Sequence, residues 1–143
     1  MEIMEVAEKA EACLHKSLGE TPFELGEARL YGVSLTEGEA DLTFISAHED
    51  IYELLDRPSD IAKKFDYIGV VTTGWAAPLN DNGEVDGAPS EHALRRRVRL
   101  VITANRDGVA SVLRFADEPD EVVTDPGQAT GSLADAIHKF VSA

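Results

Sequence analysis

The sequence has 143 residues, of which 43% are apolar and 28% charged, and its 13 basic and 27 acidic residues give a net charge of −14. This length predicts a single globular domain spanning residues 1–143, because domains usually contain about 100–200 residues. A chain this acidic lacks the excess of lysine and arginine that binds nucleic-acid phosphates. We therefore expect no nucleic-acid ligand. The single cysteine, Cys13, excludes a disulfide framework and a multi-cysteine zinc site, and we expect it to be a buried, inert thiol.

The segment Met1–Glu5 is acidic, whereas a secretory signal begins with basic and then apolar residues. No apolar stretch approaches the roughly 20 residues that cross a bilayer. We therefore expect a soluble, cytoplasmic protein without a membrane partner. Its preference for arginine over lysine and its many Ala, Asp, Val and Gly residues indicate a bacterial genome of high GC content.

A helix is expected over residues 2–18, because apolar residues recur there at steps of three and four. These residues are Ile3, Ala7, Ala10, Leu14 and Leu18. A hairpin should follow, with Glu37-Gly38 as a two-residue turn between strands at 28–36 and 39–47. The implied register pairs Leu35 with Ala40, Val33 with Leu42 and Tyr31 with Phe44, all on one face.

The sequence Ser46–Glu49 has the spacing of a capping box and predicts a short helix that ends at Pro58. Ser59 can cap a further helical turn over residues 60–65. The following segment, Tyr67–Thr73, is rich in β-branched residues and apolar on both faces, which is typical of a central strand.

A long connection over residues 75–93 precedes a second hairpin, whose strands we place at 95–105 and 109–115. With Asp107-Gly108 as its turn, Leu100 lies opposite Phe115 and Ile102 opposite Leu113. The acidic segment 117–131 predicts turns. Ser132 then caps a terminal helix with the apolar stripe Leu133, Ala136, Ile137, Phe140 and Val141.

This order, α-β-β-α-β-β-β-α, predicts an α+β fold. Because hairpins pair antiparallel, we expect a roughly five-stranded, mostly antiparallel sheet made of two hairpins and a central strand. The helices should pack on one face of that sheet.

Five arginines fall between residues 95 and 106. The two-residue period of a strand places Arg97 and Arg99 with Val101 and Thr103, away from the core face. Two interpretations stay open. The arginines grip a phosphate or carboxylate, or they form a solvated face that pairs with the chain's own acids.

The long connection is the segment of most functional interest, because structureless loops of this length tend to be functional or disordered. Two hydroxyls, a glycine and a tryptophan leave the central strand, and a histidine follows later in the loop. We predict that these residues and two arginines bind a ligand: Thr72, Thr73, Gly74, Trp75, His92, Arg97 and Arg99. The alternative is that Trp75 only packs over the sheet edge.

Metal and cofactor signatures are incomplete. Residues 82–87 space oxygen ligands like the start of a calcium loop, but Ala93 stands where that loop needs a glutamate. His48-Glu49 begins like a zinc-protease motif, but Tyr52 stands in place of its second histidine. The phosphate-binding and dinucleotide glycine patterns and the serine elbow are missing from the sequence. We expect no metal, no cofactor and no catalytic residue.

The sequence favours a non-catalytic binding or interaction module, whose partner is another protein or a second copy of itself. In a homodimer, the Val101/Thr103 face or the terminal helix would supply the contact. One alternative is a small enzyme acting on an anionic metabolite in the 72–99 region, with Arg97 or Arg99 as the anion clamp and His92 as acid or base. Another is an acidic mimic of nucleic acid that occupies a basic partner.

Overall fold

The computed structural model describes residues 2–17, 27–56, 60–76, 93–94, 96–118, 122–125 and 132–142. Its elements are α1 (Ile3–Ser17), β1 (Ala28–Thr36), β2 (Glu39–His48), α2 (Ile51–Leu55), the 3₁₀ helix η1 (Asp60–Lys64), β3 (Tyr67–Ala76), β4 (Arg96–Asn105), β5 (Gly108–Phe115), β6 (Val122–Asp125) and α3 (Ser132–Ser142). The predicted α+β class is confirmed, and the predicted order of elements roughly matches, with one strand more than predicted. None of the described helices is long and apolar enough to cross a membrane.

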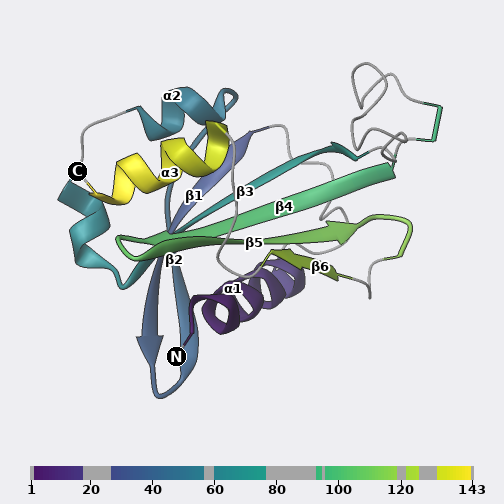
Figure 1. Ribbon diagram of the computed structural model, residues 1–143. Coiled ribbons are helices and arrows are strands. Elements are labelled where there is room, and N and C mark those ends of the chain that lie inside the picture. Colours follow the sequence, from purple (N-terminus) through teal and green to yellow (C-terminus); the bar gives the residue numbers. More distant parts are fainter. Residues whose placement is uncertain are drawn as a thin grey trace.

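The strands form one antiparallel sheet of six strands in the order β2-β1-β3-β4-β5-β6 (Figure 1). Strand β3 lies in the interior of the sheet, as its apolar sequence predicted. The extra strand is β6, which forms within the acidic segment where we predicted turns. Its valines suit an edge strand, and Val123 pairs with Leu113 of β5. The expected five strands are therefore corrected to six.

The first hairpin has the predicted turn and register. Glu37 and Gly38 both have positive φ, at 53° and 81°, as a two-residue turn of type I′ requires. Beyond Phe44 the register shifts, because a bulge lets Leu30 pair with Ser46. The turn thus determines the pairing as far as that bulge.

The second hairpin differs from the prediction by one residue in its turn. Oδ1 of Asn105 accepts hydrogen bonds from the backbone N–H groups of Asp107 at 2.9 Å and Gly108 at 3.1 Å. This local bonding closes the turn at Arg106-Asp107, one residue earlier than predicted. As a result, Leu100 pairs with Leu113 and not with Phe115. The pairing moves by two residues, so each side chain still lies on the face of the sheet that was predicted for it.

The predicted capping box is also wrong. Strand β2 continues to His48, and the cap of α2 is Asp50. Its Oδ1 accepts from the backbone N–H groups of Tyr52 at 2.9 Å and Glu53 at 3.4 Å. The predicted cap Ser59 lies outside the described residues.

Helices cover both faces of the sheet, so the expectation of one covered face is wrong. Helix α1 lies on one side, and α2 and α3 lie on the other (Figure 1). Val101 and Thr103 are fully buried beneath α1, and the predicted exposed contact at these two residues does not exist. The prediction failed because Arg99 and Thr103 alternate with apolar residues along β4, a pattern typical of a solvent-exposed face, although both are buried.

The two cores use alternate residues of the same strands. The larger core joins α2 and α3 to the sheet, and includes Leu54, Ile137, Phe140, Leu30, Val70 and Ile102. The smaller one lies under α1, and includes Val6, Ala7, Ala10, Leu14, Val71, Val101 and Val112. Cys13 is exposed, contrary to expectation, because it lies outside the buried side of α1.

Gly32 of β1 is required by the ring of Phe65. A methyl group added at Gly32 would overlap three atoms of that ring, whereas one added at Gly74 of β3 meets no described atom within 4 Å. We predict that Gly32→Ala lowers the free energy of unfolding by about 1–3 kcal/mol, the usual range for overpacking. Gly74→Ala should change it by less than about 0.5 kcal/mol. Urea unfolding measures both, and equal stability of the two variants would contradict the packing described here.

Candidate functional site

The predicted ligand-binding residues of β3 and β4 lie on neighbouring antiparallel strands. Thr73 is opposite Arg99, and Trp75 is opposite Arg97. These four residues occupy positions on the face that α1 covers, whereas Thr72 and Gly74 occupy positions on the other face. His92 lies outside the described residues. The structure therefore brings part of the predicted set together and divides the rest.

The arginines near this end of β4 make internal contacts. Nη2 of Arg97 donates to Oγ1 of Thr73 at 3.2 Å. The guanidinium of Arg96 donates two close bonds to Asp117, at 2.7 and 3.0 Å, and lies 3.8 Å over the ring of Phe115. These hydrogen bonds hold the pKa of Asp117 below its ordinary value. The interpretation that the arginines pair with the chain's own acids therefore holds for Arg96.

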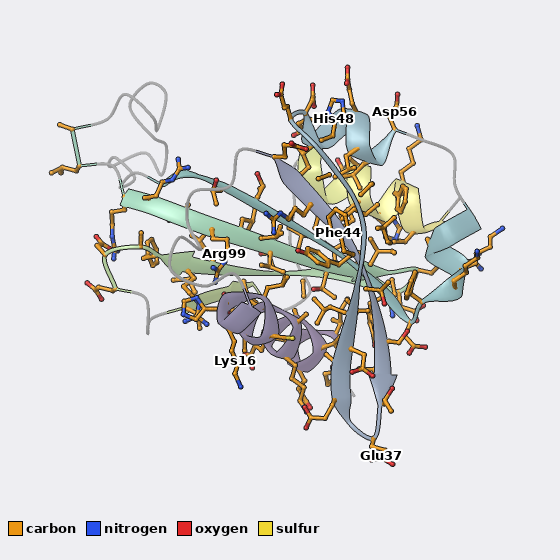
Figure 2. All side chains as sticks on the ribbon, turned by 180° about the vertical axis from the view of Figure 1, so that it is seen from behind. Lys16, Glu37, Phe44, His48, Asp56 and Arg99 are labelled. Carbon is orange, nitrogen blue, oxygen red and sulfur yellow. The ribbon has the colours of Figure 1, made fainter. Side chains whose placement is uncertain are left out.

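Arg99 has a different environment, because it is fully buried between α1 and the sheet. Its exposed fraction is 0%, and that of its partner Glu11 is 1%. Nη2 of Arg99 donates to Oε2 of Glu11 at 3.0 Å. The expected solvated strand face is therefore absent at this position, and the Arg99 side chain lies beside α1 (Figure 2).

Glu11 also binds Arg114, which lies directly opposite Arg99 on β5. The Arg114 guanidinium donates to both carboxylate oxygens of Glu11, with the closest N–O separations at 2.5 and 2.7 Å. Two like charges opposite each other destabilise a sheet. One carboxylate between them replaces that repulsion with two charge-assisted contacts.

His15 completes this cluster, one helical turn after Glu11. Its Nδ1 lies 2.9 Å from Nη2 of Arg99. Because a guanidinium can only donate, Nδ1 must be the unprotonated acceptor. The His15 ring therefore extends the hydrogen bonding of Arg99 along α1.

The acidity of Glu11 reflects these contacts. Burial by itself raises the pKa of a carboxyl group, but the hydrogen bonds and charges of Arg114 and Arg99 outweigh it. The net effect holds the pKa of Glu11 below its ordinary value of 4.5. Glu11 is thus ionised at neutral pH, as its two partners require.

The sequence prediction missed Glu11. The available signal was an acidic residue between Ala10 and Leu14, inside the apolar arc of the helix. A second signal was an arginine on each of two paired strands, Arg99 and Arg114, within otherwise apolar alternation.

The enzymatic alternative assigned an anion clamp to Arg97 or Arg99 and an acid or base to His92. Arg99 is enclosed with Glu11, and Arg97 contacts Thr73. His92 is not among the described residues. Ligand binding by the predicted set stays a prediction.

A hollow of about 400 Å³ lies on the β1–β2 side of the sheet, lined by Glu27, Arg29, Phe44 and Ala47. Arg29 and Ala47 are cross-strand partners, so a long side chain stands beside a methyl group. The ring of Phe44 borders the hollow and meets the ring of Tyr31 edge-on, with centroids 5.8 Å apart. This hollow offers a cation and an aromatic ring next to the outer strand.

That outer strand, β2, has an unusual edge. In the described part of the chain its only strand partner is β1. Residues 42–47, Leu-Thr-Phe-Ile-Ser-Ala, carry no charge and no proline, two of the common means of blocking an edge. A bulge at Ile45 interrupts this stretch. Phe44 lies between the Glu37 turn and His48, and 56% of its surface is exposed (Figure 2).

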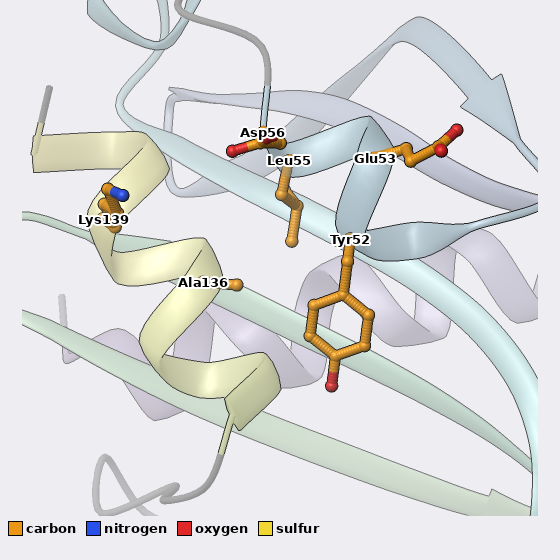
Figure 3. Close-up of a pocket in the computed structure, with 6 residues that line it drawn as sticks. All are labelled: Tyr52, Glu53, Leu55, Asp56, Ala136 and Lys139. Carbon is orange, nitrogen blue, oxygen red and sulfur yellow. The ribbon is translucent and has the colours of Figure 1, made fainter.

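A smaller cleft of about 280 Å³ separates α2 from α3 and is lined by Tyr52, Glu53, Leu55, Asp56, Ala136 and Lys139. Leu55 and Ala136 project into the gap, whereas Glu53 points away from it (Figure 3). Nε2 of His48 lies 3.1 Å from that Glu53 carboxylate. The cleft therefore has a mainly apolar floor and no convergent set of polar groups among these residues.

A metal site does not emerge from the described side chains, where no three His, Cys, Asp or Glu residues gather as ligands. His48, the histidine of the incomplete zinc motif, contacts residues close to it in the sequence. Nδ1 of His48 accepts from the backbone N–H of Asp50 at 2.8 Å, and its other ring nitrogen faces Glu53. The calcium-like segment 82–87 lies outside the described residues.

Comparison with known proteins gives no match to a family model, to a curated protein or to a solved structure.

We predict that Glu11→Gln lowers the free energy of unfolding by about 3 kcal/mol, because the buried Arg99 and the largely buried Arg114 lose their counter-charge. The folded-state pKa of Glu11 is depressed, so its contribution is complete above about pH 4.5 and is lost as the pH falls through the folded-state value. The stability difference between the wild type and the variant should therefore be constant near neutrality and shrink in acid.

Urea unfolding of both proteins between pH 3 and pH 8 measures this difference in unfolding free energy. Glu8→Gln is the matched control, because Glu8 is exposed on the same helix. It should leave stability within about 0.5 kcal/mol of the wild type. A Glu11→Gln variant that behaves like this control would contradict the structural role of Glu11.

Proposed function

We propose that this chain is a non-catalytic interaction module that binds an extended polypeptide along the edge of β2. The observation that carries the proposal is the uncharged edge at residues 42–47 together with the exposed ring of Phe44. Free strand edges recognise extended chains by adding a strand, with backbone hydrogen bonds giving affinity and side-chain pockets giving specificity.

The two edges of the sheet differ in a way that supports β2 as the binding edge. Strand β6 has four residues, whereas β2 has ten. A short edge strand offers few backbone groups, which is one means of preventing unwanted pairing. The longer strand offers a pairing surface and, beside it, the hollow with Arg29 and Phe44.

The internal use of charged groups supports a non-catalytic role. Glu11, Arg99 and Arg114 stabilise the packing of α1, and Arg96 holds Asp117. A general acid or base must reach its substrate, and Glu11 is enclosed by the fold. An aromatic side chain on an outer strand, as at Phe44, suits the recognition of an extended chain.

A displayed library of extended peptides, selected against the chain, tests the proposal. Enriched peptides should bind and should protect the backbone amides of β2 from hydrogen exchange. Phe44→Glu should weaken their binding by about tenfold or more, because aromatic residues at the centre of an interface contribute most of the affinity.

Val123→Glu is the matched control, since Val123 is an exposed apolar residue on the opposite edge strand, with 49% of its surface exposed. It should leave peptide binding unchanged. Failure to enrich any peptide, or an equal loss in both variants, would remove β2 as the binding edge.

A further inference from the structure

We propose that the polypeptide bound along β2 is a second copy of this chain, paired antiparallel through β2 about a two-fold axis at Leu42. This inference rests on the proposed function of β2 and specifies its partner. The backbone alternation of the hairpin, the position of its bulge and the order of side chains along β2 all bear on this pairing.

The hairpin turn determines which backbone groups of β2 face outward. In a two-residue hairpin the residues flanking the turn, Thr36 and Glu39, form the closing hydrogen-bonded pair. Pairs in an antiparallel ladder then alternate, so the N–H and C=O groups of Ala40, Leu42 and Phe44 point away from β1. Three successive outward positions are enough for a short antiparallel ladder.

The bulge limits the regular part of the edge. The register with β1 shifts after Phe44, because Ile45 is the additional residue on β2. The regular segment is therefore residues 39–44. Two copies of this segment, related by a two-fold axis perpendicular to the sheet, overlap best when the axis passes near Asp41 or Leu42.

Charge distinguishes between these registers. An axis at Asp41 places this carboxylate opposite its own copy, and an axis at Ala40 places Glu39 opposite Asp41. Like charges directly opposite each other are destabilising. An axis at Leu42 places Leu42 opposite its copy and Asp41 opposite Thr43 of the second copy, so each carboxylate faces a neutral side chain.

Side-chain size favours the same register. With Leu42 on the axis, Phe44 lies opposite Ala40 of the second copy on the face that carries Tyr31 and Leu42. A large ring beside a methyl group packs without crowding, and pairing there covers the exposed ring. The ring of Tyr31, the cross-strand partner of Phe44 on β1, contacts the Phe44 ring edge-on and stabilises its position.

The association should be weak and dependent on salt. Pairing of one short strand segment buries far less than the roughly 1,200–2,000 Å² of a stable interface. Each copy also carries a net charge of −14, so the copies repel at low ionic strength. Added salt screens this repulsion, and the dimer should strengthen as salt concentration rises.

Sedimentation velocity over a range of protein and salt concentrations tests for this dimer. The wild type and Val123→Glu should associate as concentration and salt increase, and Phe44→Glu should remain monomeric. A wild type that is monomeric under all conditions, or a Phe44→Glu variant that still dimerises, would overturn the proposal.

Oxidative cross-linking tests the register, in a Cys13→Ser background because Cys13 is exposed. Directly opposed residues of an antiparallel pair have Cα atoms about 4.5–5.5 Å apart, which a disulfide can bridge. Leu42→Cys should therefore give covalent dimers. Thr43→Cys should not, because it faces Asp41 of the second copy. Cross-linking through Thr43→Cys with none through Leu42→Cys would overturn the register.

The two proposals fail separately. Peptides that bind at β2 of a chain that stays monomeric would retain the interaction module and exclude the second copy. A chain without peptide binding and without association would exclude both.

Discussion

Two arginines face each other across β4 and β5, and the structure depends on the single carboxylate that lies between them. Arg99 and Arg114 are cross-strand partners, and Glu11 of α1 binds both. Without Glu11, the sheet would hold two adjacent positive charges under a helix. The ion cluster thus specifies where α1 packs, and the small apolar residues Ala7 and Ala10 let the helix lie close enough to reach it.

This constraint has a consequence for function. An arginine-rich strand in an acidic protein resembles an anion site when it is considered alone, but Arg99 is used to hold α1 in place. Arg96 is similarly bound to Asp117. Within the described part of the chain, the sheet edge at β2 offers apolar and backbone groups for the recognition that we propose. The uncharged edge of β2, with Phe44 beside Arg29, combines both in one region.

Much of the fold was predictable from local chemistry. The errors of prediction have two kinds of cause, one local and one that depends on residues far apart in the sequence. Glu37-Gly38 specified the first hairpin, because two residues with positive φ define both the turn and the register. The predicted register of the second hairpin was wrong because the Asn105 side chain closes its turn one residue earlier than predicted. Glu11 escaped prediction because its burial depends on partners 88 and 103 residues away. That β2 has only one strand partner among the described residues is likewise a property of strand order, which periodicity within one strand does not reveal.

The most direct measurement of the central claim compares the unfolding free energies of Glu11→Leu and of the triple variant Glu11→Leu/Arg99→Met/Arg114→Leu. Removal of one partner from a buried ion cluster typically costs about 3–5 kcal/mol, whereas replacement of the whole cluster by apolar residues is often neutral or stabilising. The account predicts a severely destabilised single variant and a triple variant that recovers most of the wild-type stability. A single variant as stable as the wild type, or a triple variant no more stable than the single one, would contradict it.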